Sequence, residues 1–167
     1  MEFKKVTLKN KATFQKVYIT ALTQGFDPFV PINFINNFNK NFDEHFFEIF
    51  NDKNQFLYIC YEEKVPVGVI VFGKSKLEGA TETDGFLNSI YFLKAYHGKG
   101  SAKQALEFLE EKLKSLNYKK VFLWCSKENK RAWKFYTKHN YTPLENKTWN
   151  DTLDGKVFHN ILFVKDI

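Results

Sequence analysis

The sequence predicts one α/β domain of the α+β kind, in which a central mixed, mostly antiparallel sheet of about six or seven strands is flanked by about four helices. Three observations predict this class. Short apolar, strand-like runs recur along the chain, and amphipathic segments with helical spacing lie between them. The 167 residues, 44% of them apolar, contain no linker or shift in composition, so residues 1–167 suit one compact domain.

The first third of the chain predicts a strand, a helix and a less regular region. Residues 3–8 alternate well enough for a strand, and residues 10–24 place apolar side chains at helical spacing. The next stretch, residues 25–41, is rich in Phe and Asn and is interrupted by two prolines. It is too apolar for a disordered linker, so we expect an ordered loop or short helical pieces before a helix over residues 43–50.

The middle of the chain predicts a hairpin followed by one more strand. Two strand-like runs, residues 56–61 and 65–73, flank a polar turn at residues 62–64. A polar segment over residues 74–85 then leads into a strand over residues 86–93.

The last part of the chain predicts two helices and two strands. Residues 102–116 carry apolar side chains on one helical face and charged ones elsewhere, as in a helix lying on a sheet. A short apolar strand is expected over residues 120–125, and a second helix over residues 129–138. A polar loop, residues 145–155, is expected before a final strand over residues 157–164.

Net charge and cysteine content limit which kinds of partner and which cellular compartment are expected. The net charge of +6 favours an anionic partner or simply a basic solvated surface. A nucleic-acid partner is not expected, because the chain has one arginine, Arg131, and no helix-turn-helix or ribonucleoprotein motif. No apolar stretch reaches the roughly 18 residues of a membrane span, and the amino terminus lacks a signal-peptide pattern. Cys60 and Cys125 lack metal-ligand spacing and read as buried free thiols. We therefore expect a cytoplasmic monomer or homodimer without a metal.

The clearest motif is the turn His-Gly-Lys-Gly-Ser-Ala at residues 97–102, between the strand at 86–93 and the following helix. Gly98 and Gly100 lack Cβ atoms, so a ligand can approach the backbone closely. The N–H groups and dipole of the helix beyond them suit a pyrophosphate. Such a turn by itself can be a mere tight connection, and neither the Walker nor the Rossmann spacing is present.

A second motif, on the last helix, gives the glycine turn its context. Asn129, Ala132 and Phe135-Tyr136 follow in the order Asn-x-x-Ala-x-x-Phe-Tyr. Together with the glycine turn this resembles the acetyl-CoA-binding core of the GCN5-related N-acetyltransferase (GNAT) family, over about residues 65–143. Three positions depart from the family pattern: His97 replaces Gln or Arg, Asn140 replaces Gly, and Trp124 stands where some relatives carry a glutamate base.

The resemblance implies acetyl-CoA as cosubstrate and assigns the donor side. The backbone at Ile90, Tyr91 and Phe92 would bind the pantetheine arm and polarise the thioester. The pyrophosphate would be held by the turn, which comprises His97, Gly98, Lys99, Gly100, Ser101 and Ala102. Asn129 would contact pantetheine, and Tyr136 would protonate the departing thiolate. Basic residues near the expected 3′-phosphate are Lys99, Lys103, Lys134 and, as the best candidate, Arg131.

Each of these roles has a structural alternative. Tyr136 lies on the apolar face of its helix, where an aromatic residue can be core. Asn129 could cap that helix, and Ser126 is a rival for the same position. The lysines and Arg131 could be ordinary solvated charges.

The acceptor side is less defined. A protonated amine must lose a proton before attack, and the candidate bases are Glu82, Asp84 and His45. Specificity is expected in residues 25–50 and 145–156. In these segments the aromatic residues Phe26, Phe29, Phe34, Phe38 and Trp149 could line a pocket, and the acidic residues Glu145, Asp151 and Asp154 could attract a cation.

The expected function is transfer of an acetyl group from acetyl-CoA to the primary amine of a small molecule or peptide. The alternative is a non-catalytic acyl-CoA-binding module of the same fold.

Overall fold

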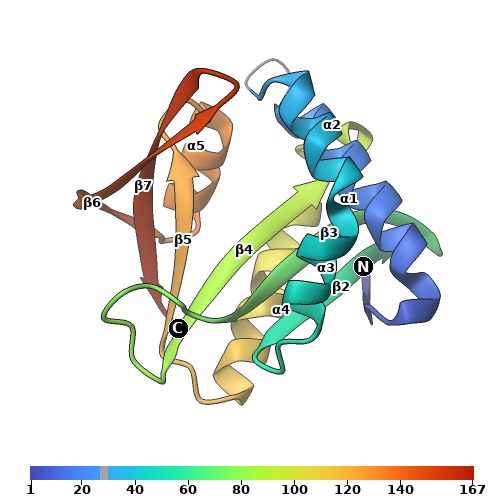
Figure 1. The fold of residues 1–167 in the computed structure, drawn as a ribbon. Helices are drawn as coiled ribbons and strands as arrows, with labels where there is room; N and C mark the ends of the chain where they lie inside the picture. The colour runs from blue at the N-terminus through green and yellow to red at the C-terminus, as the bar shows by residue number, and fades with distance from the viewer. Residues whose placement is uncertain (27–29) are drawn as a thin grey trace.

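A computed structural model describes residues 1–26 and 30–167 of the chain. Its centre is a seven-stranded sheet in the order β1-β2-β3-β4-β5-β7-β6 (Figure 1). Strands β4 and β5 pair in parallel, and all other neighbours pair antiparallel. The strands are β1 (Glu2–Lys5), β2 (Gln55–Glu62), β3 (Val65–Lys74), β4 (Asp84–Phe92), β5 (Lys120–Ser126), β6 (Thr142–Leu153) and β7 (Lys156–Asp166).

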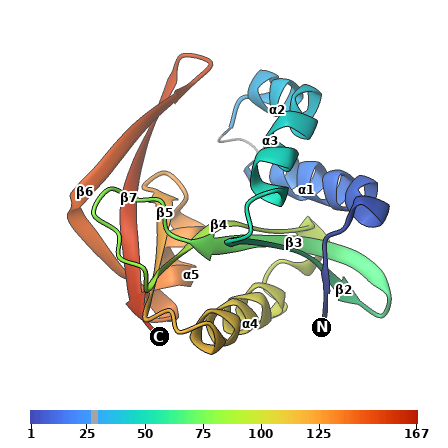
Figure 2. The same cartoon turned by 60° about the horizontal axis from the view of Figure 1, so that its bottom comes forward.

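Helices cover both faces of this sheet (Figure 2). One face carries α1, α2 and α3, and the other carries α4 and α5. A hydrophobic cluster lies on each side, built around Phe14, Phe42 and Phe46 on the first face and around Leu106, Leu109 and Leu113 on the second. The helices are α1 (Lys11–Phe26), α2 (Ile32–Lys40), α3 (Phe42–Phe50), α4 (Ser101–Ser115) and α5 (Lys130–Lys138), with 3-10 turns η1 (Leu8–Asn10) and η2 (Lys94–Tyr96).

Most elements lie where the sequence predicts them. The β2–β3 hairpin is confirmed, and its turn places both Glu63 and Lys64 at positive φ (48° and 67°), as a two-residue hairpin loop of type I′ requires. The α+β class and the mixed sheet are confirmed as well. No helix among the described residues is long and apolar enough to cross a membrane.

Two expectations about elements were wrong. The polar loop expected over residues 145–155 is mostly strand β6, which pairs with β7 around the turn Asp154-Gly155. As an edge strand with largely exposed residues, β6 needs no apolar alternation, and the Asp-Gly turn was the overlooked signal. In the region over residues 25–41, where an ordered loop or short helical pieces were expected, the structure has the short helix α2, and the described residues hold five α-helices. The first strand is shorter than expected, because η1 begins at Leu8.

The feature that creates the site is a bulge in β4. Val71 pairs with Ser89 and Phe72 pairs with Leu87, which leaves Asn88 as the extra residue. In the described residues β4 and β5 pair only from Asp84–Lys120 to Phe86–Phe122, before this bulge. Beyond it the two strands diverge, as Figure 1 shows.

Candidate active site

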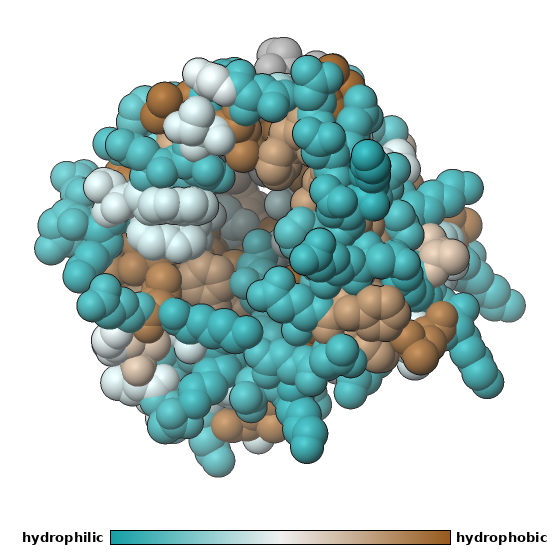
Figure 3. All heavy atoms as spheres, viewed as in Figure 1, coloured by the Kyte–Doolittle hydropathy of each residue, from teal (hydrophilic) through white to brown (hydrophobic). Residues whose placement is uncertain are grey.

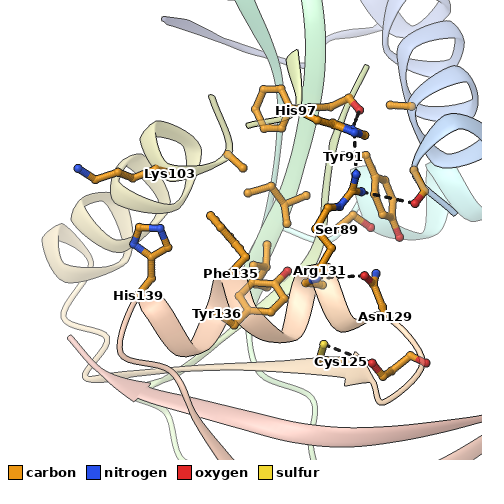
Figure 4. Close-up of a pocket in the computed structure, with 18 of the residues that line it drawn as sticks. Ser89, Tyr91, His97, Lys103, Cys125, Asn129, Arg131, Phe135, Tyr136 and His139 are labelled. Atoms are coloured by element: carbon orange, nitrogen blue, oxygen red, sulfur yellow. Dashed lines mark hydrogen bonds between the residues drawn. The ribbon is translucent and has the colours of Figure 1, made fainter. Parts of the chain in front are cut away.

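A cavity of about 750 Å³ lies where β4 and β5 separate. Figure 3 shows the hollow in the surface between the helices beside β4 and the β5–β7 side of the molecule. Its lining comes from β4, the turn before α4, β5 and α5, with contributions from α1 and β7. Figure 4 shows part of this lining, with ten residues labelled.

The backbone of β4 faces the cavity at alternate residues. The Leu93 N–H donates to Val67 O at 2.9 Å, so Leu93 is directed toward β3. By the alternation of an antiparallel pair, Tyr91 also faces β3, whereas Ile90 and Phe92 direct their N–H and C=O groups toward the gap. The expectation that all three backbones bind the cosubstrate is therefore corrected for Tyr91. The backbone of Tyr91 faces β3, and Tyr91 lines the cavity, with its side chain drawn in Figure 4.

The glycine turn presents backbone groups to the cavity. Gly98 and Gly100 have φ of 75° and 88°, a conformation that favours glycine, and nothing lies within 4 Å of a Cβ built on either. The first bond of α4 runs from Gln104 N–H to Gly100 O at 3.1 Å. Among the described residues, the N–H groups of Ser101, Ala102 and Lys103 have no backbone acceptor. Three donors at a helix N-terminus beside an open cradle suit a phosphate group.

The side chains of two predicted turn residues point elsewhere. Ser101 is buried, and its hydroxyl donates to Glu62 Oε1 at 2.9 Å, which ties the start of α4 to the β2–β3 hairpin. Lys99 lies with its Nζ 5.7 Å from the centre of the Tyr96 ring and does not line the cavity. Neither side chain is therefore placed to contact a ligand there, and Lys103 lines the cavity instead.

His97 and Arg131 form a bridge at the edge of the cavity (Figure 4). The His97 Nε2 lies 2.8 Å from Phe92 O, and because a carbonyl can only accept, Nε2 carries the proton. The Arg131 Nη1 then donates to His97 Nδ1 at 2.7 Å. Burial lowers the pKa of His97, the hydrogen bond to Phe92 O opposes this, and the neighbouring Arg131 and Lys94 charges lower the pKa further. The imidazole is thus held neutral, with one nitrogen donating and the other accepting.

Asn129 caps α5, as one of the two alternatives proposed. Its Oδ1 accepts from the Ala132 N–H at 3.0 Å, and the side chain lines the cavity. Its amide nitrogen makes no hydrogen bond to a described residue, so the cap leaves a donor for a ligand. Ser126 is not the cap, because its hydroxyl donates to Glu128. Burial raises the pKa of Glu128, but hydrogen bonds from Ser126 and His159 outweigh it and hold that pKa at about 2.

Tyr136 is a core residue whose hydroxyl opens on the cavity. Its ring packs against Tyr141, Phe163 and Phe135, and its exposed fraction is 8%. Among the described residues, every fully buried side-chain oxygen has a hydrogen-bond partner, and the Tyr136 hydroxyl makes no hydrogen bond to any of these residues. The Tyr136 hydroxyl is therefore not fully buried. It faces the cavity, as Figure 4 shows. Burial raises the pKa of Tyr136, and the Cys125 thiol and Tyr91 raise it further, so the hydroxyl keeps its proton.

The structure does not bring the predicted bases to the cavity. Glu82 is largely exposed and pairs with Lys74, and Asp84, at the opposite end of β4, accepts from the Thr81 N–H at 2.8 Å. The sequence predicts Glu82 and Asp84 from their positions just before and at the start of β4, but the cavity opens only after the bulge at Asn88. His45 is exposed on α3 and stacks on Phe38, with ring centres 5.2 Å apart. All three predictions are corrected.

The predicted acceptor segments contribute unequally. Phe34 and Phe38 stack on each other, and Phe38 also stacks on Tyr18, so both belong to the aromatic packing of α1 and α2. Trp149 is half exposed on β6. Phe29 and the side chain of Phe26 lie outside the described residues.

Sequence reasoning missed a group of hydroxyls on β4 and α1. The Tyr18 hydroxyl lies 2.8 Å from Ser89 Oγ, and the Tyr18 and Tyr91 rings meet edge to face. Ser89 and Tyr91 line the cavity. The signal for this group was the Ser-x-Tyr alternation in β4, but the partner on α1 lies 71 residues away in the chain.

Solved structures of acetyltransferases share this fold. A putative phosphinothricin N-acetyltransferase has the same fold, with a TM-score of 0.76 and 15% identity over 99% of this chain and 98% of that chain. A ribosomal-protein-alanine N-acetyltransferase from Brucella melitensis gives 0.74 and 14% over 100% of both chains. The PaiA N-acetyltransferase from Thermoplasma acidophilum, solved in complex with coenzyme A, gives 0.72 and 14% over 99% and 98%.

The sequence itself identifies the family. The model of the Acetyltransferase (GNAT) family matches residues 22–141, which is more than half of the chain. The chain therefore belongs to the GNAT acetyltransferase family. A search of curated protein sequences gave no significant match.

Proposed function

We propose that the protein transfers the acetyl group of acetyl-CoA to a primary amine of a small molecule or peptide. One observation carries this proposal: the open N-terminus of α4, the backbone of Ile90 and the Tyr136 hydroxyl all face one cavity. The lining also suits a polyanion, because Lys103, Arg131 and Lys138 are among its residues. Coenzyme A carries a pyrophosphate and a thiol. The α4 N-terminus and the cationic residues suit the pyrophosphate, and the Ile90 backbone and the Tyr136 hydroxyl suit the thiol end.

The chain's own groups would hold the reactants and move one proton. The α4 N–H groups would bind the pyrophosphate, and the Ile90 N–H would donate to the thioester carbonyl oxygen, where negative charge develops. The amine nitrogen bonds to the acetyl carbon, the carbon–sulfur bond breaks, and Tyr136 donates its proton to the sulfur. The amine's surplus proton leaves to water, and water returns a proton to the Tyr136 phenolate, so the amine proton balances the one given to sulfur. A phenol retains its proton at neutral pH and can donate to a thiolate, whose conjugate acid has a pKa near 8.5.

A non-catalytic acyl-CoA-binding module is the second candidate, and one observation favours it. Within the described residues, no carboxylate lines the cavity. The two histidines of the lining, His97 and His139, both have pKa values lowered by burial, and His97 uses both ring nitrogens in hydrogen bonds. Turnover then depends on an amine that is already neutral. Binding of acetyl-CoA without release of free thiol, across amines assayed up to alkaline pH, would establish the binding module.

The experiment that tests the leading proposal combines binding and turnover. Calorimetry should show acetyl-CoA binding to the wild type, and thiol release should require an added amine. In Tyr136→Phe we expect kcat to fall about 100-fold, because general acid catalysis contributes on that order, while the Kd of acetyl-CoA stays within about twofold. Tyr118→Phe, which removes a hydroxyl remote from the cavity, is the matched control. Undiminished turnover in Tyr136→Phe would remove that residue from the acid role.

A further inference from the structure

The lining of the cavity divides into two halves by the face of the sheet. Ser89 and Tyr91 face α1, because Ser89 contacts Tyr18 and Tyr91 packs in the cluster on that face. On β5, Leu123 and Cys125 belong to the core under α4 and α5, so the alternating Trp124 and Ser126 face the α1 side. Asn160 pairs with Ser126 and shares its face. We call this the acceptor half; it comprises Ala21, Gly25, Asn88, Ser89, Tyr91, Trp124, Ser126 and Asn160.

The two halves differ in charge. The donor half, under α4 and α5, includes Lys103, Arg131 and Lys138. The Arg131 Nη2 reaches across to Gly25 O, at the edge of the acceptor half, at 3.5 Å. The described side chains of the acceptor half are neutral: an indole, amides, hydroxyls and small residues. The Tyr91 hydroxyl stays neutral because burial raises its pKa. The donor half therefore suits a polyanion, and the acceptor half suits an uncharged molecule.

Trp124 is an indole that the protein buries only in part. It is half-buried and lines the cavity, and it packs in neither of the two hydrophobic clusters of the described residues. Its aromatic partner is Trp149 on β6, at 6.2 Å between ring centres and a tilt of 55°, and Trp149 is itself 50% exposed. Trp149 pairs with Asn160 in the sheet, so both indoles lie on the α1 side. A large apolar ring that lines a cavity, outside the core, is a surface for another flat ring.

The opposite wall offers hydrogen bonds to an amine. The Ser89 and Tyr18 hydroxyl oxygens lie 2.8 Å apart, and Tyr91 lines the cavity beside them. Asn88 donates to Gln55 Oε1 at 2.9 Å, which orients its carbonyl oxygen as an acceptor. Each hydroxyl oxygen retains acceptor capacity, so this wall can hold an N–H group without a charge.

We propose that the acceptor is an amine with an uncharged, aromatic body, bound with its ring against Trp124 and its amine toward Ser89 and Tyr91. This inference rests on the proposed function, because it names the acceptor of the same site. Trp124 is the specificity-determining residue, and Trp149 extends the aromatic wall onto the β6–β7 hairpin. A free aromatic amine derivative and the first residue of a peptide share this chemistry.

The test compares acceptors that have the same α-amine but differ in their bodies. We expect kcat/KM for phenylalaninamide to exceed that for alaninamide at least about tenfold, and to exceed that for spermidine by a larger factor. Trp124→Ala should reduce kcat/KM about tenfold for phenylalaninamide, mainly through KM, and leave alaninamide within about twofold. Trp124→Phe should recover most of the loss. The peptide Phe-Gly-Gly tests the other source: higher kcat/KM than phenylalaninamide indicates a chain end, and lower indicates a small molecule.

Two controls separate the possible failures. Val157→Ala changes an exposed residue of the β6–β7 hairpin on the face opposite Trp149. It should leave the kcat/KM of phenylalaninamide unchanged relative to that of alaninamide and to that of spermidine. The Kd of acetyl-CoA in each Trp124 variant reports whether the site still folds. Preference of the wild type for spermidine, or equal losses for both amides in Trp124→Ala, would overturn this inference and leave the proposed function intact. Failure of the wild type to bind acetyl-CoA would instead overturn the proposed function.

Discussion

The donor and acceptor halves of the cavity are built from different parts of the chain. The donor half relies on backbone groups, namely the N–H groups at the start of α4 and the gap-facing amides of β4, with cationic side chains around them. The acceptor half consists of side chains: the Trp124 indole, the Ser89 and Tyr91 hydroxyls and two amides. Backbone groups persist when residues change, whereas side chains do not. The donor half can therefore stay constant while the acceptor half sets specificity.

The difference in charge between the two halves should give the largest measurable effect. Lys103→Glu reverses a charge on the donor half, and we expect it to raise the Kd of acetyl-CoA about tenfold or more at low salt. The effect should shrink in high salt, because Lys103 is exposed and screened. Asn160→Asp adds a negative charge to the acceptor half and should change that Kd about twofold at most. Calorimetry at two salt concentrations makes both measurements.

The same pair of variants sharpens the comparison from the acceptor side. Asn160→Asp introduces a carboxylate near Trp124 and Ser126, and we expect it to raise kcat/KM for cationic acceptors such as spermidine. Equal effects of the two variants on acetyl-CoA affinity would contradict the division of the cavity into a cationic and a neutral half.

The bridge from His97 to Arg131 should have a smaller effect. His97→Leu removes one hydrogen bond to Phe92 O and one from Arg131, so we expect the Kd of acetyl-CoA to rise about fivefold to tenfold. His97→Gln supplies an amide N–H and an amide oxygen in the same places and should stay within about threefold of wild type. Titration of both variants by calorimetry is the measurement. Similar losses in the two variants would show that the ring, rather than its two hydrogen bonds, is needed.

The sequence predicted the donor half better than the acceptor half, for a physical reason. The glycine turn, the start of α4 and the cap at Asn129 are local, so neighbouring residues specify them. The acceptor half joins Tyr18 to Ser89, and Trp124 to Trp149, across long separations in the chain. Glu82 and Asp84 were predicted as bases from their place beside β4. The bulge at Asn88 puts the opening at the other end of that strand, and periodicity does not reveal a bulge.

The fold shows the same division between local and distant signals. The β2–β3 hairpin and helices α4 and α5 follow from turn residues and amphipathic spacing, and they were predicted nearly to their ends. Strand β6 was not, because an edge strand forms by pairing with β7 and carries little apolar pattern of its own. Helix α2 was expected only as one of two alternatives, an ordered loop or short helical pieces, for a related reason. Its residues are mostly Asn and Phe, and only Ile35 is fully buried.

The free energy of unfolding should fall in acid because of two histidines on the donor half, and this is the smallest of the expected effects. Burial lowers the pKa of both His97 and His139, which lie on the donor half. At neutral pH both are neutral in the folded and unfolded chains. As pH falls below about 6.5, the unfolded chain binds protons that the folded chain does not, so the free energy of unfolding decreases. Each histidine contributes at most about 1.4 kcal/mol per pH unit, down to its folded pKa.

His97→Gln isolates the contribution of the bridge to this acid response. The variant keeps the hydrogen bonds but has no titrating ring, so its free energy of unfolding should fall less than that of the wild type between pH 7 and pH 5.5. Denaturant titrations at several pH values give both slopes. Glu128 does not confound the measurement. Its folded pKa of about 2 lies below the usual value near 4.3, so the stability it contributes is lost only below that usual value. Parallel pH profiles for the variant and the wild type would mean that His97 titrates alike in both states, and that the bridge does not hold it neutral.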